Sequence, residues 1–387
     1  MRPFDFECFK ATIDELHREG STAQAAETWC QPSAVYRSAD RARDEQLRIF
    51  DRLPLVVACS SELAEPNAYL ARSVVGTPVL VARQADGSVR AFFNSCRHRG
   101  TEVVWGEAAG CARRFTCPYH GWTYGTDGRL LGITTDVGFP DLDREQSGLV
   151  ELACAERHGL VFVGRRPDVV VDLDEYLGPL DAELQSMQLG RFVVERRHQV
   201  EVEANWKLIM DGFLETYHVR FLHAATLTDR LYSDRNSYDA FGPHGRLASM
   251  RKTYDPAGVQ TPSELLSQLI VSYRLFPNTE ILWAIDHYEV WQIEPDPGRA
   301  DRCRVRMALL TRPEDSGRSE HWARNLEMAM DIITSEDFAA ARSAQRALDG
   351  GAAPEQVVYG RNEPGVQHFH QELTARLTGN ALVGGPE

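Results

Sequence analysis

The chain has 387 residues, of which 43% are hydrophobic and 25% are charged, a composition typical of a folded globular protein. Its 42 Lys and Arg residues face 56 Asp and Glu residues, and the net charge of −14 excludes binding to nucleic acid by bulk electrostatics. No apolar run reaches the roughly 20 residues that a membrane-spanning helix requires, and the first residues lack the apolar core of a signal peptide. We therefore expect a cytoplasmic protein of about two to three domains, whose eight cysteines stay reduced.

The first half of the chain predicts a helical segment followed by an all-β block. Residues 1–45 show helical and irregular patterns, whereas short runs with turn signals follow them. Residues 75–83 and 89–95 are predicted to be two strands that Asp86-Gly87 joins in a hairpin turn. The pattern indicates a small β domain that ends near residue 166.

The second half of the chain alternates long strands with helices. The predicted strands are 191–205, 279–295 and 303–311, and the predicted helices are 172–184, 205–218 and 318–348. This pattern is typical of an α+β fold, in which helices pack on a long antiparallel sheet. Alternate side chains of residues 279–295 form two faces, one with Trp283 and one with Leu282, and either face can line a pocket.

Two Cys-His pairs stand in the predicted β block. Cys96 and His98 lie in NSCRHRG, and Cys117 and His120 lie in FTCPYHGW. Each pair is expected on a tight loop between strands, and two such loops can clamp one metal centre. Two thiolates with two imidazoles suit a [2Fe-2S] cluster in which one iron takes both cysteines and the other takes both histidines.

Three other interpretations of the Cys-His pairs remain open from spacing alone. A structural zinc site uses the same ligand types, although it usually pairs Cys with Cys and His with His. The second alternative is a disulfide between Cys96 and Cys117, and the third is a chance cluster of these residues without a metal. The remaining cysteines have no partner at ligand spacing.

The two loops resemble the cluster-binding motif of Rieske proteins. The surrounding AFFNSCRHRG and CPYHGWTYGTDG resemble the terminal oxygenase (alpha) subunits of Rieske non-haem iron oxygenases. This resemblance implies an all-β Rieske domain over 46–166 and a catalytic domain with mononuclear iron over 167–387. It also implies a helix-grip (START-like) antiparallel sheet with helices in the catalytic domain, on which the segment 1–45 packs.

A second group of candidate ligands lies in NWKLIMDGFLETYHVRFLH, residues 205–223. On an ideal helix Glu215 and His218 are neighbours, but His218 and His223 diverge by about 140°. The two histidines can therefore share a metal only if the helix ends or bulges between them. Spacing alone favours the ordinary alternative, an amphipathic helix with a solvated polar face.

The resemblance assigns roles to these residues. His218 and His223 match the iron ligands of the family, and Glu215 matches the carboxylate that links an iron-ligand histidine to a cluster histidine of the neighbouring subunit. Relatives most often carry Asp at this linking position. Glu resembles the branch that includes carnitine and glycine betaine oxygenases.

The third iron ligand is expected on a later helix. Asp337 in TSEDFAAARSAQRAL resembles the family's E-D…Q-R-x-L stretch, and Glu336 is the fallback. The open alternative is an ordinary helix N-terminal cap at Thr334 or Ser335. Residues 360–373 also resemble the family's C-terminal stretch, and their histidines are interpreted as structural.

The resemblance implies an enzyme with several components. No nucleotide-binding fingerprint is visible, so an outside ferredoxin or NAD(P)H-linked flavin reductase is expected to supply electrons. A homotrimer is expected, because in relatives the bridge between the two metal centres crosses a subunit boundary. A basic rim is predicted to dock an acidic ferredoxin, although the same side chains are equally well explained as solvated loop charges: Arg97, Arg99, Arg113 and Arg114.

The expected substrate is an aromatic or cyclic small molecule, as in aromatic hydrocarbon catabolism, because such substrates are the most widespread in the family that the chain resembles. N-demethylation or C–N cleavage of an amine or quaternary ammonium compound is the alternative that Glu215 suggests. A non-enzymatic carrier of hydrophobic ligands also fits a sheet gripped by a helix, but it leaves the candidate redox ligands unexplained.

Overall fold

The computed structural model describes residues 6–379, which form two compact units. Residues 50–176 make up one unit, and the segments before and after them make up the other. The sequence predicted domain limits at residues 45 and 166. Among the described residues, no helix combines the length and the apolar character that crossing a membrane requires.

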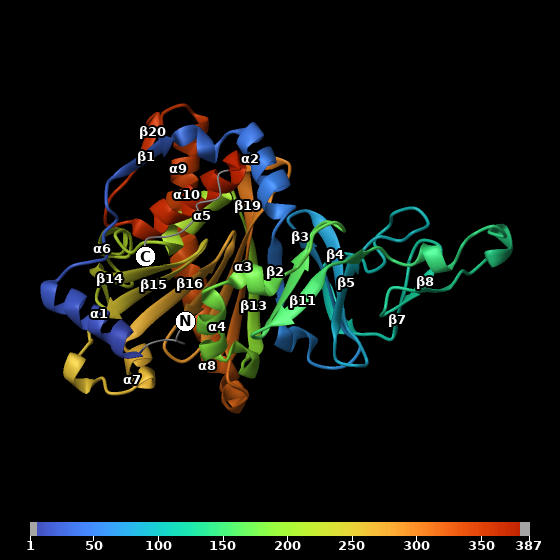
Figure 1. Ribbon diagram of the computed structural model, residues 1–387, viewed down its shortest axis with the longest axis horizontal. Coiled ribbons are helices and arrows are strands. Elements are labelled where there is room, and N and C mark those ends of the chain that lie inside the picture. Colours follow the sequence, from blue (N-terminus) through green and yellow to red (C-terminus); the bar gives the residue numbers. More distant parts are fainter. Residues whose placement is uncertain (1–5, 380–387) are drawn as a thin grey trace. The chain divides into compact units, whose positions relative to one another are not determined.

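The unit of residues 50–176 is built from three antiparallel sheets. Their strand orders are β10-β5-β4-β3-β6, β11-β12-β2 and β7-β8-β9 (Figure 1). The strands are β2 (Pro54–Cys59), β3 (Ala68–Val74), β4 (Thr77–Arg83), β5 (Val89–Phe93), β6 (Ala108–Cys111), β7 (Arg114–Thr116), β8 (Thr123–Gly125), β9 (Leu130–Gly132), β10 (Glu151–Leu152), β11 (Cys154–Arg157) and β12 (Leu160–Gly164). The predicted hairpin is confirmed, because β4 pairs with β5 and places Val79 opposite Phe93.

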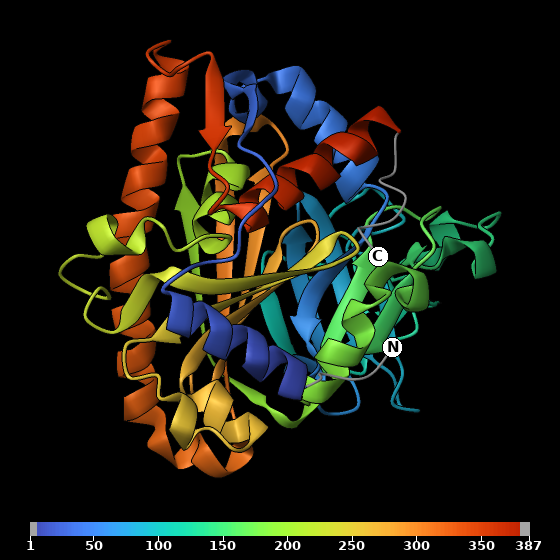
Figure 2. The same ribbon diagram turned by 60° about the vertical axis from the view of Figure 1, so that its left-hand side comes forward.

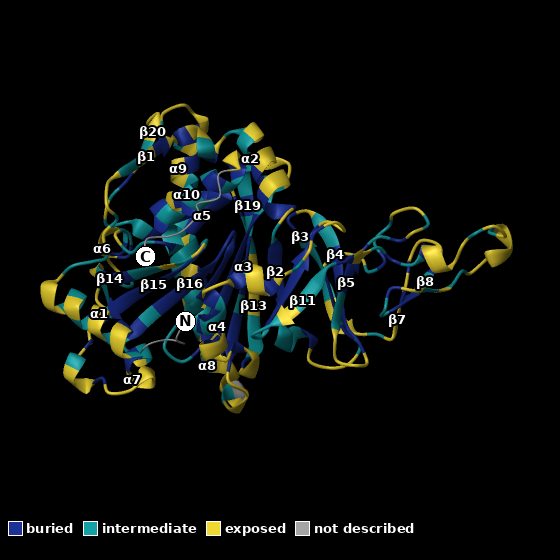
Figure 3. Cartoon of the chain, viewed as in Figure 1, coloured by how far each residue is buried: buried dark blue, intermediate teal, exposed yellow. Residues whose placement is uncertain are grey.

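The second unit is organised around a seven-stranded antiparallel sheet in the order β13-β19-β18-β17-β16-β15-β14. These strands are β13 (Val193–Val202), β14 (Leu231–Phe241), β15 (His244–Arg251), β16 (Leu269–Leu275), β17 (Thr279–Trp283), β18 (Tyr288–Asp296) and β19 (Arg299–Thr311). A short antiparallel pair is formed by β1 (Trp29–Pro32) and β20 (Gln356–Tyr359). The α+β class and the long antiparallel sheet are confirmed, and Figure 3 shows the central strands as buried.

The prediction of one long strand over 279–295 is wrong. Residues 284–287 form a tight turn between β17 and β18, which pair with each other. The backbone N–H of Ala284 donates to the carbonyl of His287 at 3.0 Å, and Ile285 has a φ of 76°. The alternation of faces predicted across Trp283 therefore breaks at the turn.

Helices cover this sheet. They are α1 (Phe6–Glu19), α2 (Ala39–Glu45), α4 (Leu180–Met187), α5 (Trp206–Phe213), α6 (Val219–Leu222), α7 (Pro262–Ser267), α8 (Ser319–Ile332), α9 (Phe338–Asp349) and α10 (Pro364–Thr378), while α3 (Leu173–Leu177) stands at the limit between the units. Figure 2 shows α8 and α9 as one long orange-to-red run, joined by a π-helical turn over Ile333–Asp337. The predicted helix 172–184 is instead two helices, because Gly178 and Pro179 interrupt it.

Candidate metal centres

The start of α5 is fixed by buried polar contacts. The Asn205 side chain accepts the backbone N–H of Lys207 and so caps the helix. The Trp206 indole and the Lys207 ammonium both donate to Glu45 of α2, at 3.0 and 2.9 Å. Because Lys207 and Glu45 are almost fully buried, this charge pair ties the first turn of α5 to one place in the fold.

The end of α5 differs from the predicted helix over 205–218. The helix stops at Phe213, after Gly212, whose missing side chain weakens the last turn. The Glu215 carboxylate then accepts the backbone N–H of His218 at 3.1 Å and also contacts Nδ1 of the same ring. His218 and His223 consequently flank the short helix α6, which is the break in the helix that a shared metal requires.

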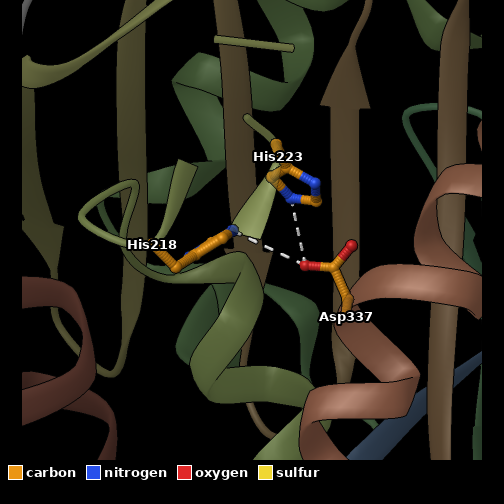
Figure 4. Close-up of side chains that lie close together, drawn as sticks. All are labelled: His218, His223 and Asp337. Carbon is orange, nitrogen blue, oxygen red and sulfur yellow. Dashed lines mark ion pairs between the residues drawn. The ribbon is translucent and has the colours of Figure 1, made fainter. Parts of the chain in front are cut away.

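Asp337 completes a cluster with these two histidines. It ends the π-helical turn before α9, and its Oδ1 lies 3.5 Å from Nε2 of His218 and 3.3 Å from Nε2 of His223 (Figure 4). One ligand atom from each residue lies within 4.8 Å of the others. We call this cluster of His218, His223 and Asp337 the metal site. Two imidazoles and one carboxylate on one side of an ion are the donor set of non-haem Fe(II) sites, so the residues present fit such an ion.

Glu336 contacts the ring nitrogen of His223 that does not face Asp337. Its carboxylate contacts Nδ1 of His223 and accepts a hydrogen bond from Thr226 Oγ1 at 2.9 Å. Burial lowers the pKa of His223, but the carboxylates of Asp337 and Glu336 together raise it above its usual value. Each histidine of the metal site thus has a carboxylate on Nδ1, which leaves Nε2 directed to Asp337. The sequence considered Glu336 only as an alternative ligand.

Gln345 holds α9 against α5. Its side-chain oxygen accepts the backbone N–H of Asn205 at 2.9 Å, and its amide donates to Asp349. Within α9, buried residues recur at helical spacing, from Phe338 through Ala341 to Leu348. The helix that begins after Asp337 is therefore anchored to the start of the helix that precedes the two histidines.

A cavity of about 390 Å³ opens beside the metal site. Most of its wall is aliphatic, contributed by α5, α6, α9 and the strands β15, β16 and β17. Glu215, His218, His223 and Asp337 form its polar end. Leu282 lines it, whereas Trp283, on the opposite face of β17, does not appear in the wall.

The two Cys-His loops in the other unit share one geometry. In each loop the backbone N–H of the glycine four residues after the cysteine donates a hydrogen bond to the carbonyl of that cysteine, at 2.9 Å for Gly100 and 3.0 Å for Gly121. Both glycines have positive φ, 78° and 74°, which favours glycine over any residue with a Cβ. The repeated turn presents each cysteine and its histidine on the same loop.

The four side chains of these loops converge. Cys96 and Cys117 are buried and close enough to interact, and Nδ1 of His98 lies 3.2 Å from Nδ1 of His120. The Tyr124 hydroxyl lies 3.2 Å from Cys96 Sγ. Burial raises the pKa of the Cys96 thiol, and the neighbouring Cys117 adds to that rise. Paired sulfurs inside and paired imidazole nitrogens outside fit the mixed ligand set of a Rieske cluster.

The remaining predictions for this unit concern its cysteines and its charged rim. All eight cysteines lie in the described part of the chain and none of them forms a disulfide, which excludes the Cys96–Cys117 pairing. The predicted basic rim is exposed at each of its four positions: Arg97, Arg99, Arg113 and Arg114.

Comparison with known proteins identifies both units. Residues 54–142 match the Rieske [2Fe-2S] domain, and residues 189–379 match the catalytic domain of the ring hydroxylating alpha subunit. The carnitine monooxygenase oxygenase subunit of Acinetobacter pittii (strain PHEA-2) is 35% identical over 198 residues, 49% of this chain and 51% of that protein. The chlorobenzene dioxygenase subunit alpha of Cupriavidus sp. (strain PS12) is 34% identical over 190 residues, 48% of this chain and 42% of that protein.

The fold is also found in solved structures. The quaternary ammonium Rieske monooxygenase CntA, crystallised with an inhibitor, is 25% identical, with a TM-score of 0.77 over 90% of this chain and 95% of CntA. The chain spans about half the length of the curated relatives that it matches. A Rieske domain carries a [2Fe-2S] cluster, and the catalytic domain of this family carries a mononuclear iron. With one domain of each kind in a single polypeptide, the chain belongs to the alpha (oxygenase) subunits of the Rieske non-haem iron oxygenases.

Proposed function

We propose that the chain is the terminal oxygenase component of a multicomponent Rieske oxygenase, which hydroxylates an aromatic or cyclic small molecule with dioxygen. The observation that carries this proposal is the metal site at the polar end of an aliphatic cavity. In this proposal His218, His223 and Asp337 hold the mononuclear iron. Such an iron, when bound, supplies open coordination positions for dioxygen beside the substrate.

The four loop residues Cys96, His98, Cys117 and His120 hold the [2Fe-2S] cluster in the proposal. Support comes from the buried sulfurs and from the imidazoles that reach the surface. Replacing two thiolates by neutral imidazoles raises the reduction potential of such a cluster. The Tyr124 hydroxyl lies within hydrogen-bond distance of the Cys96 sulfur, and a hydrogen bond to that sulfur stabilises the reduced form of the cluster.

Glu215 is proposed as the bridge between the metal site and the cluster of a neighbouring subunit. Its carboxylate already contacts both the backbone and the ring of His218. Two large side chains next to this point are solvent-exposed in the isolated chain, Tyr217 at 58% and Phe221 at 71%. Exposed aromatic side chains of this size are typical of a surface that a partner covers. We infer a homotrimer, in which each such surface receives the Rieske unit of the next subunit.

The electron donor is proposed to be a ferredoxin or a flavin reductase. Arg97 and Arg99 flank His98 in the first cluster loop and are exposed, so they can attract an acidic partner to the edge of the cluster. A cytoplasmic location is part of the proposal, because free thiols and thiolate-bound clusters suit a reducing compartment.

The cavity wall supports an uncharged substrate. Among the described residues, none of the side chains that line the cavity is Arg, Lys, Tyr or Trp, and its two phenyl rings are those of Phe213 and Phe338. A volume of about 390 Å³ lies in the range of small-molecule sites, and an aliphatic wall favours an apolar ring. Oxidation of aromatic compounds is therefore the catabolic role that we propose.

The second candidate is the oxidation of a quaternary ammonium compound. It is favoured by Glu215 and by the similarity to the carnitine monooxygenase oxygenase subunit. Such a cation is usually held by aromatic faces, and a zwitterion with a carboxylate needs Arg or Lys in addition. The cavity wall supplies neither the aromatic cage nor the cation, which is why this candidate stands second.

The test is dioxygen uptake by the iron-loaded protein with a surrogate reductase, followed by mass analysis of the product. We expect a cyclic substrate to stimulate uptake and to gain one or two oxygen atoms. His223→Ala should abolish this uptake, whereas the same change at the exposed His198 should leave it intact. Release of formaldehyde from betaines, without oxidation of any cyclic compound, would establish the second candidate instead. Absence of substrate-dependent uptake with both classes would refute the oxygenase.

A further inference from the structure

Two serines interrupt the aliphatic wall of the cavity on the side of the sheet. Ser249 of β15 and Ser272 of β16 both line the cavity, and both side chains are at least nine-tenths buried. In the register of the two strands Ser249 lies opposite Ile270, and Ser272 lies opposite Leu247, so the serines are diagonal neighbours on one face. They form a single polar spot on this wall.

Ser272 is backed by a buried acid. Its hydroxyl donates to Glu280 Oε2 at 2.5 Å, while Glu280 is fully buried on β17. The other oxygen of this carboxyl, Oε1, has no hydrogen-bond partner among the described residues. A buried carboxyl with one unsatisfied oxygen is unfavourable in a purely structural position, since apolar residues of the same volume avoid that penalty.

The acid determines what Ser272 presents to the cavity. Because the Ser272 hydroxyl donates to Oε2 of Glu280, a proton on this carboxyl is carried by Oε1, and the lone pairs of Ser272 Oγ remain available to a group inside the cavity. The Ser249 hydroxyl has no partner among the described residues, so it can donate or accept. The third hydroxyl in the wall, that of Thr216, already contacts Ser233 and Asn236.

We propose that Ser272 and Ser249 form a polar subsite that accepts a hydrogen bond from an O–H or N–H group of an otherwise apolar cyclic substrate. The subsite selects which substrates are bound and which carbon of the ring faces the metal site. This inference rests on the proposed function, because it names the substrate class of the same cavity. A hydroxylated or N–H-containing ring suits the subsite better than the parent hydrocarbon does.

The test compares two probes of nearly equal shape, indole with its N–H and indene without it. Binding of each is measured by equilibrium dialysis against the anaerobic, iron-loaded protein, with no electron donor present. A net hydrogen bond corresponds to about a three- to tenfold difference in affinity. We expect Ser272→Ala to lower the preference for indole over indene by that factor. Ser237→Ala, an equally buried serine of the same sheet outside the cavity wall, should leave the preference unchanged.

An unchanged preference in Ser272→Ala, or failure of both probes to bind the wild-type protein, would overturn the subsite. Dioxygen uptake with other ring compounds is measured in parallel, so that the two proposals fail separately. Uptake without binding of the probes would remove only the subsite. Serine-dependent binding without any dioxygen uptake would support the subsite and overturn the oxygenase.

Discussion

The buried carboxyl of Glu280 makes the stability of the chain depend on pH in a way that one substitution can isolate. Burial raises the pKa of Glu280 from 4.5 to about 8, and the hydrogen bond from Ser272 opposes this rise only in part. Between these two values the folded chain keeps a proton that the unfolded chain has released. The free energy of unfolding therefore falls as the pH rises through this window.

The size of the effect follows from the two pKa values. Where the folded state holds one more proton than the unfolded state, stability changes by about 1.4 kcal/mol per pH unit. Between about pH 6 and about pH 8 the carboxyl of Glu280 thus removes about 2 kcal/mol from the free energy of unfolding. Glu280→Gln is neutral at both pH values, so it should lack this contribution.

The assay is urea unfolding of the iron-loaded wild-type and Glu280→Gln proteins at both pH values. Other titrating groups are common to both proteins, so they cancel when the pH dependence of one is subtracted from that of the other. We expect the variant to gain about 2 kcal/mol relative to wild type between the lower and the higher pH. Glu320→Gln, the same change at an exposed side chain, is the control. Parallel pH dependence in wild type and Glu280→Gln would refute a protonated, buried Glu280.

Three further substitutions test the metal centres. Glu336→Gln should weaken iron binding about 10- to 100-fold, measured by chelator competition, whereas Glu327→Gln at an exposed position of α8 should not. Glu215→Ala, reconstituted with excess iron, should keep both metals but stop turnover; full activity would exclude the bridge. Tyr124→Phe should lower the reduction potential of the cluster in voltammetry, because the Cys96 sulfur loses a hydrogen bond, and an unchanged potential would contradict this contact.

The cluster loops are the part of the site that the sequence predicts most completely. Cys96 and Cys117 each start a short local motif, and the glycine four residues later closes the turn, so nearly all of the geometry is encoded within one loop. The β4–β5 hairpin is equally local, because Asp86-Gly87 specifies its turn. Local motifs of this kind depend little on the rest of the fold.

The features that the sequence could not predict depend on distant residues or on side-chain contacts. The apolar periodicity of α5 continues past Phe213, and only the contact of Glu215 with the backbone of His218 shows that the helix has ended. The alternation over 279–295 likewise gives no sign of the turn at Ile285, which contains neither Gly nor Pro. Glu336 meets His223 across 113 positions of sequence, a distance that helical spacing does not reach.

Iron analysis combined with EPR of the dithionite-reduced protein tests most directly whether one polypeptide holds two kinds of iron. We expect about three irons per chain, a Rieske-type signal, and the selective loss of one iron in His223→Ala. Two irons per chain that both survive this substitution would indicate an electron carrier. Protein that stays colourless and free of iron after anaerobic reconstitution would contradict both metal centres.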